Sequence, residues 1–139
     1  LAFSHDPIYE VSDLELRREN KSYTVDTLEQ LAALYPKDRF YLIMGSDMFC
    51  SLTNWYRWQR IIQLAVICAG ARQSGTSDQS MQEQRRTLES LGASCKLVDF
   101  EPLPISSTMI RERVCKGKAI QGLVAPAVAE YIQSHGLYR

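Results

Sequence analysis

The sequence has few of the residues that carry covalent or metal chemistry. It has only two histidines, neither with a nucleophile or carboxylate at a telling spacing, so we expect neither to be catalytic. Its four cysteines are scattered and form no Cys-x-x-Cys pair, which argues against a structural zinc site. Because Cys68 and Cys95 lie in apolar runs, we expect reduced, buried thiols in a cytoplasmic protein.

An excess of charge and a long apolar run are also missing. Sixteen basic residues balance sixteen acidic ones, which disfavours binding to nucleic acid or to an anionic membrane. The longest apolar stretch, 61–71, is interrupted by Gln63 and is too short to cross a bilayer. With 139 residues, of which 45% are hydrophobic, the chain is expected to form a single domain over 1–139 with an ordinary core.

Apolar periodicity alternates between strand-like and helix-like segments. The expected elements, in chain order, are a short edge strand at 9–16, a helix at 24–36, a strand at 40–44, a helix at 55–65, a strand at 66–70, a polar helix in the eighties, a strand at 96–100 and two closing helices. This order predicts an α/β fold with parallel strands joined by crossovers. The unbroken apolar run at 40–44 is typical of a strand buried on both faces.

Ligands of an open α/β sheet bind beyond the carboxyl ends of its strands, so the residues that follow each strand are candidates. Gly45 and Asp47 follow the first of the three. Asp47 could accept hydrogen bonds from a ribose, or could cap the next helix. Arg72 follows the second strand, where it could hold a phosphate or be an ordinary solvated arginine.

The segment after the third strand, ISSTMIR, has more hydroxyl groups than a helix start needs. Ser106 as the cap explains one of them. Ser107 and Thr108 then fall on the first turn, where free N–H groups favour an anion. Arg111 follows on the same face and could grip phosphate oxygens. The segment is either a capped helix start or a polyphosphate site.

Two earlier positions could recognise a flat, acidic ring. Ser22, Tyr23 and Thr24 precede a helix, either as a capping cluster or as amides that receive a carboxylate. Trp55 and Trp58 are three residues apart in a predicted helix. Trp58 extends the apolar stripe into the core, whereas Trp55 lies at the helix entrance and could stack on a ring.

The segments SYTVDTL, MGSDM, VICAGARQ, ISSTMIR and VAEYIQSHGLYR together resemble bacterial nicotinate-nucleotide adenylyltransferases. The resemblance implies a Rossmann-like nucleotidyltransferase fold with flanking helices. It also implies that ATP and nicotinate mononucleotide give nicotinate adenine dinucleotide and pyrophosphate, with Mg²⁺ on the phosphates. For ATP, the resemblance implies that Ser107, Thr108 and Arg111 bind the phosphates, that Ile105 contacts adenine, that Gly45 and Asp47 contact the ribose, and that Ser106 also belongs to the ATP site. For the nicotinate nucleotide, it implies that Trp55 stacks on the pyridine ring, that the Tyr23 and Thr24 amides bind its carboxylate, and that Arg72 binds a phosphate.

The sequence departs from this family at its beginning. The family opens with a strand and a G-G-x-F-x-P-x-H-x-G-H turn whose histidines bind phosphate, and no such segment is present. We therefore expect a C-terminal portion that lacks the first strands and is inactive by itself. A sheet without those strands has an exposed edge, through which we expect association with another chain.

Two other functions remain open. One is a phosphopantetheine-type adenylyltransferase, although a pantetheine arm has no flat ring to stack on Trp55. The other is a non-catalytic module that binds a nucleotide or a partner protein.

Overall fold

The computed structural model describes residues 1–3, 6–72, 75–100 and 103–139, and for 71, 72, 75–78 and 100 it describes the backbone alone. His5 lies outside the described residues. The contacts divide the chain into two compact units, one of residues 13–102 and the other of 1–12 with 103–139. Each unit is described by itself, and a single domain over 1–139 stays a prediction.

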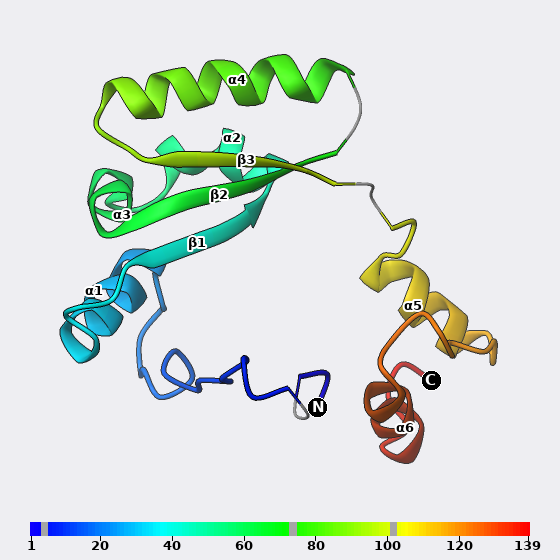
Figure 1. The fold of residues 1–139 in the computed structure, drawn as a ribbon. Helices are drawn as coiled ribbons and strands as arrows, with labels where there is room; N and C mark the ends of the chain where they lie inside the picture. The colour runs from blue at the N-terminus through cyan, green and yellow to red at the C-terminus, as the bar shows by residue number, and fades with distance from the viewer. Residues whose placement is uncertain (4–5, 73–74, 101–102) are drawn as a thin grey trace. The chain divides into compact units, whose positions relative to one another are not determined.

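A three-stranded parallel sheet forms the centre of the unit 13–102 (Figure 1). The strands are β1 (Phe40–Gly45), β2 (Ala65–Arg72) and β3 (Cys95–Phe100), in the order β1-β2-β3. Gly45 pairs with Gly70, and Arg72 pairs with Phe100, so the carboxyl ends of all three strands lie at one edge. The predicted α/β fold with parallel strands is confirmed.

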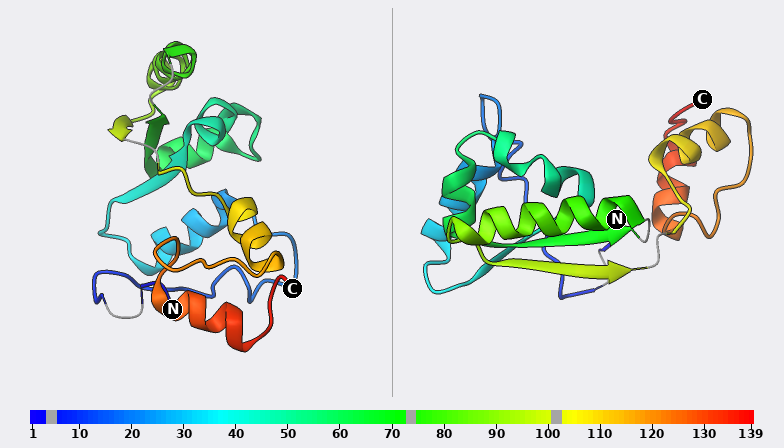
Figure 2. Two further views of the ribbon diagram at one scale, coloured as in Figure 1. Left: turned by 90° about the vertical axis from the view of Figure 1, so that its right-hand side faces the viewer. Right: turned by 90° about the horizontal axis from the view of Figure 1, so that it is seen from above.

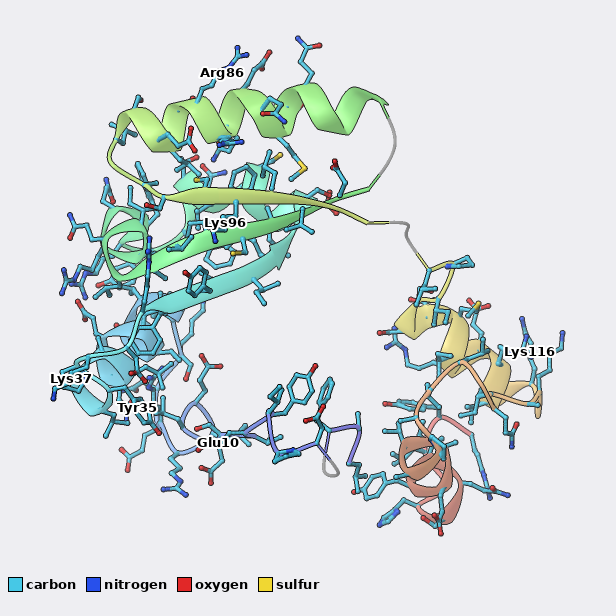
Figure 3. The ribbon with its side chains drawn as sticks, in the orientation of Figure 1. Glu10, Tyr35, Lys37, Arg86, Lys96 and Lys116 are labelled. Atoms are coloured by element: carbon cyan, nitrogen blue, oxygen red, sulfur yellow. The ribbon has the colours of Figure 1, made fainter. Side chains whose placement is uncertain are left out.

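Helices cover one face of this sheet. The elements are α1 (Thr24–Leu34), α2 (Ser46–Cys50), the 3₁₀ helix η1 (Leu52–Asn54), α3 (Trp58–Leu64) and α4 (Gly75–Ser90). Helices α2, α3 and α4 pack against β2, and Figure 2 shows α4 running along the length of the strands. Phe49, Leu52, Ile61, Ile67 and Met81 are fully buried in the shared core. Arg86 projects from the outer face of α4 (Figure 3).

The opposite face of the sheet is uncovered among the described residues of this unit. The exposed Tyr41 and Ile43 alternate with half-buried Phe40 and Leu42 and with buried Met44, and Ile43 is 81% exposed. Lys96, labelled in Figure 3, lies with its Nζ 5.2 Å from the centre of the Tyr41 ring. The expectation that β1 is buried on both faces is therefore wrong, because helices pack on one face only. Association through the sheet stays a prediction, which concentration-dependent sedimentation tests.

The expected edge strand at 9–16 is also wrong. The backbone at 13–17 turns instead, with the carbonyl of Asp13 accepting from the amides of Leu16 at 2.8 Å and Arg17 at 3.2 Å. A strand needs a neighbour with free backbone groups, and none of the three strands pairs with this segment.

The second unit contains α5 (Ser107–Cys115) and α6 (Pro126–Ser134). Pro126 is at the first position of α6, where its missing N–H costs nothing. Ile110, Ile120 and Ile132 form a small buried cluster. None of the helices in the described part of the chain is both long and apolar enough to cross a membrane.

Candidate functional site

A cavity of about 360 Å³ lies in the unit 13–102, between the start of α1 and the loop that leads into α3. The residues that line it are Lys21, Ser22, Tyr23, Thr24, Asn54, Trp55, Tyr56 and Ile61. The structure therefore brings together Tyr23, Thr24 and Trp55, which the sequence places some thirty residues apart. All three were predicted to contact one ligand.

The α1 side of the cavity offers backbone donors. Tyr23 is the N-cap residue but makes no side-chain cap, and the Ser22 hydroxyl donates instead to the carbonyl of Glu15 at 3.1 Å. The alternative hypothesis, in which residues 22–24 form a side-chain capping cluster, is therefore wrong. The amides of Asp26 and Thr27 bond the Tyr23 carbonyl, while no described residue accepts from the amide of Thr24, which lines the cavity. Free amides at a helix start can receive an anion.

The other side of the cavity is aromatic. Trp55 is half-buried, and the rings of Tyr56 and Tyr23 lie 4.6 Å apart. Lys21 adds a positive charge, with its Nζ 5.1 Å from the centre of the Tyr23 ring. Trp55 does not lie in a helix as predicted, because α3 begins only at Trp58 and Trp55 is extended (φ −79°, ψ 151°). Trp58 packs against the core, as expected.

At the carboxyl edge of the sheet, Gly45 ends β1 and is the N-cap residue of α2. Asp47 is exposed in the first turn of α2. It is not the cap, so that alternative is wrong. Arg72 is the last residue of β2 rather than a loop residue, and its side chain lies outside the described part of the structure.

The remaining predicted site residues are in the other unit, at the start of α5. The Ser106 hydroxyl accepts from the amide of Met109 at 3.1 Å, which confirms the predicted cap. Ser107 and Thr108 are exposed on the first turn. Arg111 donates from Nη2 to the Thr108 hydroxyl at 3.3 Å, so the two share a face as expected. Ile105, which precedes the cap, is 38% exposed.

Metal ligands do not cluster in the part of the chain that the structure describes. No group of three or more His, Cys, Asp or Glu side chains there could enclose an ion. Mg²⁺ in nucleotide sites takes most of its ligands from phosphates and water, with few from the protein. The described residues therefore form no metal cage of their own, and they are compatible with a Mg²⁺ ion that arrives bound to the triphosphate.

Comparisons with known proteins agree on one family. Residues 2–113 match the cytidylyltransferase-like family. A probable nicotinate-nucleotide adenylyltransferase of Lachnoclostridium phytofermentans is 37% identical over 99% of this chain and 69% of its own. One from Desulfitobacterium hafniense is 38% identical over 99% of this chain and 67% of its own. This chain belongs to the nicotinate-nucleotide adenylyltransferase family.

The fold of this chain is also seen in a solved structure. Nicotinic acid mononucleotide adenylyltransferase of Plasmodium falciparum, complexed with APC, matches with a TM-score of 0.60 and 20% identity. The match covers 86% of this chain and 60% of the solved one, so this chain spans less than two thirds of that protein. The same protein complexed with NaAD matches equally well. At this identity the likeness shows the fold alone, and the Rossmann-like expectation is confirmed.

Reasoning from the sequence missed several residues that line the cavity, two of which are charged or aromatic. Lys21 and Tyr56 line it beside the predicted residues. Tyr56 had a visible signal, because it follows Trp55 and extends the aromatic side. Lys21 had none, because a lysine between Asn20 and Ser22 reads as an ordinary surface residue.

Proposed function

We propose that this protein binds nicotinate mononucleotide in the cavity between α1 and the Asn54–Tyr56 loop. In the whole enzyme the bound nucleotide would receive AMP from ATP, giving nicotinate adenine dinucleotide and pyrophosphate as a step of NAD biosynthesis. The names of the relatives support this reaction. The phosphopantetheine reaction is the weaker candidate, because its acceptor has no flat ring to match the aromatic side of the cavity.

The observation that carries the proposal is the pairing of free amides with aromatic rings around one cavity. The amide of Thr24 has no acceptor among the described residues, and Lys21 adds a positive charge. Trp55 and Tyr56 supply flat apolar surface at the same place. A pyridine ring that bears a carboxylate needs both features, since the ring stacks and the carboxylate accepts hydrogen bonds.

The proposed reaction requires no protein nucleophile. A 5′-phosphate oxygen of nicotinate mononucleotide bonds to the α-phosphorus of ATP, and the bond from that phosphorus to the pyrophosphate oxygen breaks. The protein's part is to hold two mutually repelling anions in line and to stabilise the charge that develops. No catalytic residue is proposed within this chain.

The ATP-binding residues stay predictions. Ser106, Ser107, Thr108 and Arg111 would hold the phosphates at the start of α5, and Mg²⁺ bound to those phosphates would neutralise part of their charge. Ile105 would contact adenine, and Gly45 and Asp47 the ribose. Arg72 would contact a phosphate.

Titration calorimetry with three acceptors tests the proposal. We expect nicotinate mononucleotide to bind more tightly than nicotinamide mononucleotide, which lacks the carboxylate, and phosphopantetheine to show no binding. Equal affinity for the two mononucleotides would remove the role of the α1 amides. Tighter binding of phosphopantetheine would replace the acceptor altogether.

A coupled assay for dinucleotide formation tests whether these 139 residues suffice for the reaction. We expect no turnover, because the glycine–histidine segment that the family uses is not in this sequence. Turnover that depends on both ATP and nicotinate mononucleotide would contradict this expectation. We also propose a cytoplasmic location, which the four free cysteines support.

A further inference from the structure

The loop that carries the aromatic side of the cavity is anchored in the core at both ends. Leu52, in η1, is fully buried, and so is Ile61 in α3. Between these anchors the side chains of Trp55 and Tyr56 reach the cavity, and Arg57 follows them directly. Arg57 connects Trp55 and Tyr56 to the start of α3. An interaction that fixes the backbone at Arg57 therefore also fixes the orientation of these two aromatic residues relative to α3.

Arg57 has a left-handed backbone conformation, with φ 51° and ψ 40°. This region is disfavoured for residues with a Cβ, apart from asparagine and aspartate, whose short side chains bond the local backbone. Tyr138 is the other described residue of this kind that is not glycine. An arginine here needs an interaction that holds it.

That interaction comes from α1. Arg57 donates from Nη1 to Oε2 of Glu29 at 3.2 Å and from Nη2 to Oε1 at 3.0 Å. Arg60 donates from Nε to the same Oε1 at 3.1 Å. The two-pronged contact fixes the orientation of the guanidinium as well as its distance, which a lysine could not do. The hydrogen bonds from Arg57 lower the pKa of Glu29 from its ordinary value, followed in effect by those from Arg60.

Glu29 belongs to the helix whose first residues form the opposite side of the cavity. Its side chain lies on α1, five residues after Thr24. The ion pair therefore joins the two sides of the cavity, and the Tyr23 and Tyr56 rings, with centroids 4.6 Å apart, form a second contact between the same two segments.

We propose that Glu29 and Arg57 are positioning residues that hold Trp55 and Tyr56 against the start of α1, so that the cavity is preformed for a flat carboxylated ring. This inference rests on the proposed function for the identity of the ring, but not for the ordering of the loop. Preformed sites bind more tightly because less side-chain and loop freedom is lost on binding.

Three substitutions separate the ion pair from the backbone strain. Glu29→Gln removes the charge and keeps the shape. Arg57→Gly removes the ion pair but suits the left-handed conformation. Arg57→Lys keeps the charge without the fork. The matched control is Glu89→Gln, which removes the Arg85 ion pair on α4, a pair of similar exposure that does not line the cavity.

The first measurement is the order of the two tryptophan indole N–H groups by ¹⁵N relaxation in the protein without ligand. We expect Glu29→Gln and Arg57→Gly to raise the mobility of the Trp55 indole alone, and Arg57→Lys to have a smaller effect. Trp58, which packs against the core, serves as the internal reference. A change at both indoles would indicate general loosening of the fold and would overturn the inference, as would no change at Trp55.

The second measurement is the affinity for nicotinate mononucleotide by calorimetry. Because the ion pair is exposed and acts on the ligand only through the loop, we expect affinity to fall by roughly two- to fivefold in Glu29→Gln and in Arg57→Gly. Glu89→Gln should leave it unchanged. Unchanged affinity in the two ion-pair variants would overturn the inference. If the unmodified protein fails to bind, the proposed function fails, while the indole measurement still decides whether the ion pair orders the loop.

Discussion

The starts of α1 and α5 were both expected to receive an anion, yet they are built differently. At α5 the Ser106 side chain caps the helix by accepting from the Met109 amide. At α1 the N-cap residue Tyr23 makes no side-chain cap, and Thr24, the first residue of the helix, lines a cavity with aromatic residues. The α5 start is thus partly satisfied by its own sequence and open to water, whereas the α1 start leaves room for a ligand. The start of a helix can bind many anions, and it becomes specific for one ligand only where neighbouring side chains also contact that ligand.

The largest expected effect in this comparison is at the aromatic side of the α1 cavity. Trp55→Ala should weaken binding of nicotinate mononucleotide by about tenfold or more, since stacking on an aromatic side chain is worth about 1–3 kcal/mol per base. Calorimetry measures it. Tyr35→Ala, at an exposed aromatic just beyond the far end of α1, is the control and should change nothing. An unchanged affinity in Trp55→Ala would show that the two helix starts are equally unspecific.

The sequence predicts those parts of the structure that follow from local residue patterns, and it misses those that depend on contacts between residues distant in the sequence. The strand β2 and the helix α1 follow from local apolar patterns, and Pro36 ends the helix pattern close to Leu34. The cap at Ser106 is equally local. The start of α3 was misplaced because the apolar period continues back to Trp55.

What interrupts that period is the left-handed Arg57, which Glu29 holds from a helix 28 residues away. Such a contact leaves no mark in either local pattern. The expected strand at 9–16 failed for a related reason, because alternation of apolar residues does not supply a partner strand. The predicted roles of the site residues stay predictions, since no ligand contact follows from local patterns.

The two adjacent serines at the start of α5, Ser106 and Ser107, are expected to contribute differently to stability. Ser106→Ala should lower the free energy of unfolding of its unit by about 1 kcal/mol, because it removes the cap. Ser107→Ala should leave stability unchanged, since the Ser107 side chain makes no hydrogen bond to a described residue. Thermal unfolding followed by circular dichroism compares the two. Equal losses would mean that both hydroxyls serve the helix and that neither is spare for a ligand.

A smaller effect is expected at the phosphate-binding face of α5. Arg111→Gln should weaken ATP binding by roughly fivefold, and the loss should shrink as salt is added, because an exposed charge contact is screened. Lys116→Gln, just beyond the other end of the same helix, is the control, since Lys116 pairs with Glu112 and with no other acidic group of the described residues. If both substitutions weaken ATP binding alike, the α5 start attracts anions through general charge and not through a site.

The smallest expected effect is a loss of thermal stability at acidic pH, and it is expected at the α1 cavity because Glu29 lies on α1. The pKa of Glu29 is lowered below its ordinary value of 4.5, first by the hydrogen bond from Arg57 and then by that from Arg60. A lowered carboxyl pKa means that the ionised form favours the folded state, so this stabilisation is present above pH 4.5 and is lost as the pH falls through the folded-state pKa. The melting temperature of the unmodified protein should therefore exceed that of Glu29→Gln near neutral pH, and the difference should narrow below pH 4.5. A difference that persists at low pH would mean that the carboxylate charge is not what joins α1 to Arg57, and the aromatic side of the cavity would then owe its position to core packing at Leu52 and Ile61.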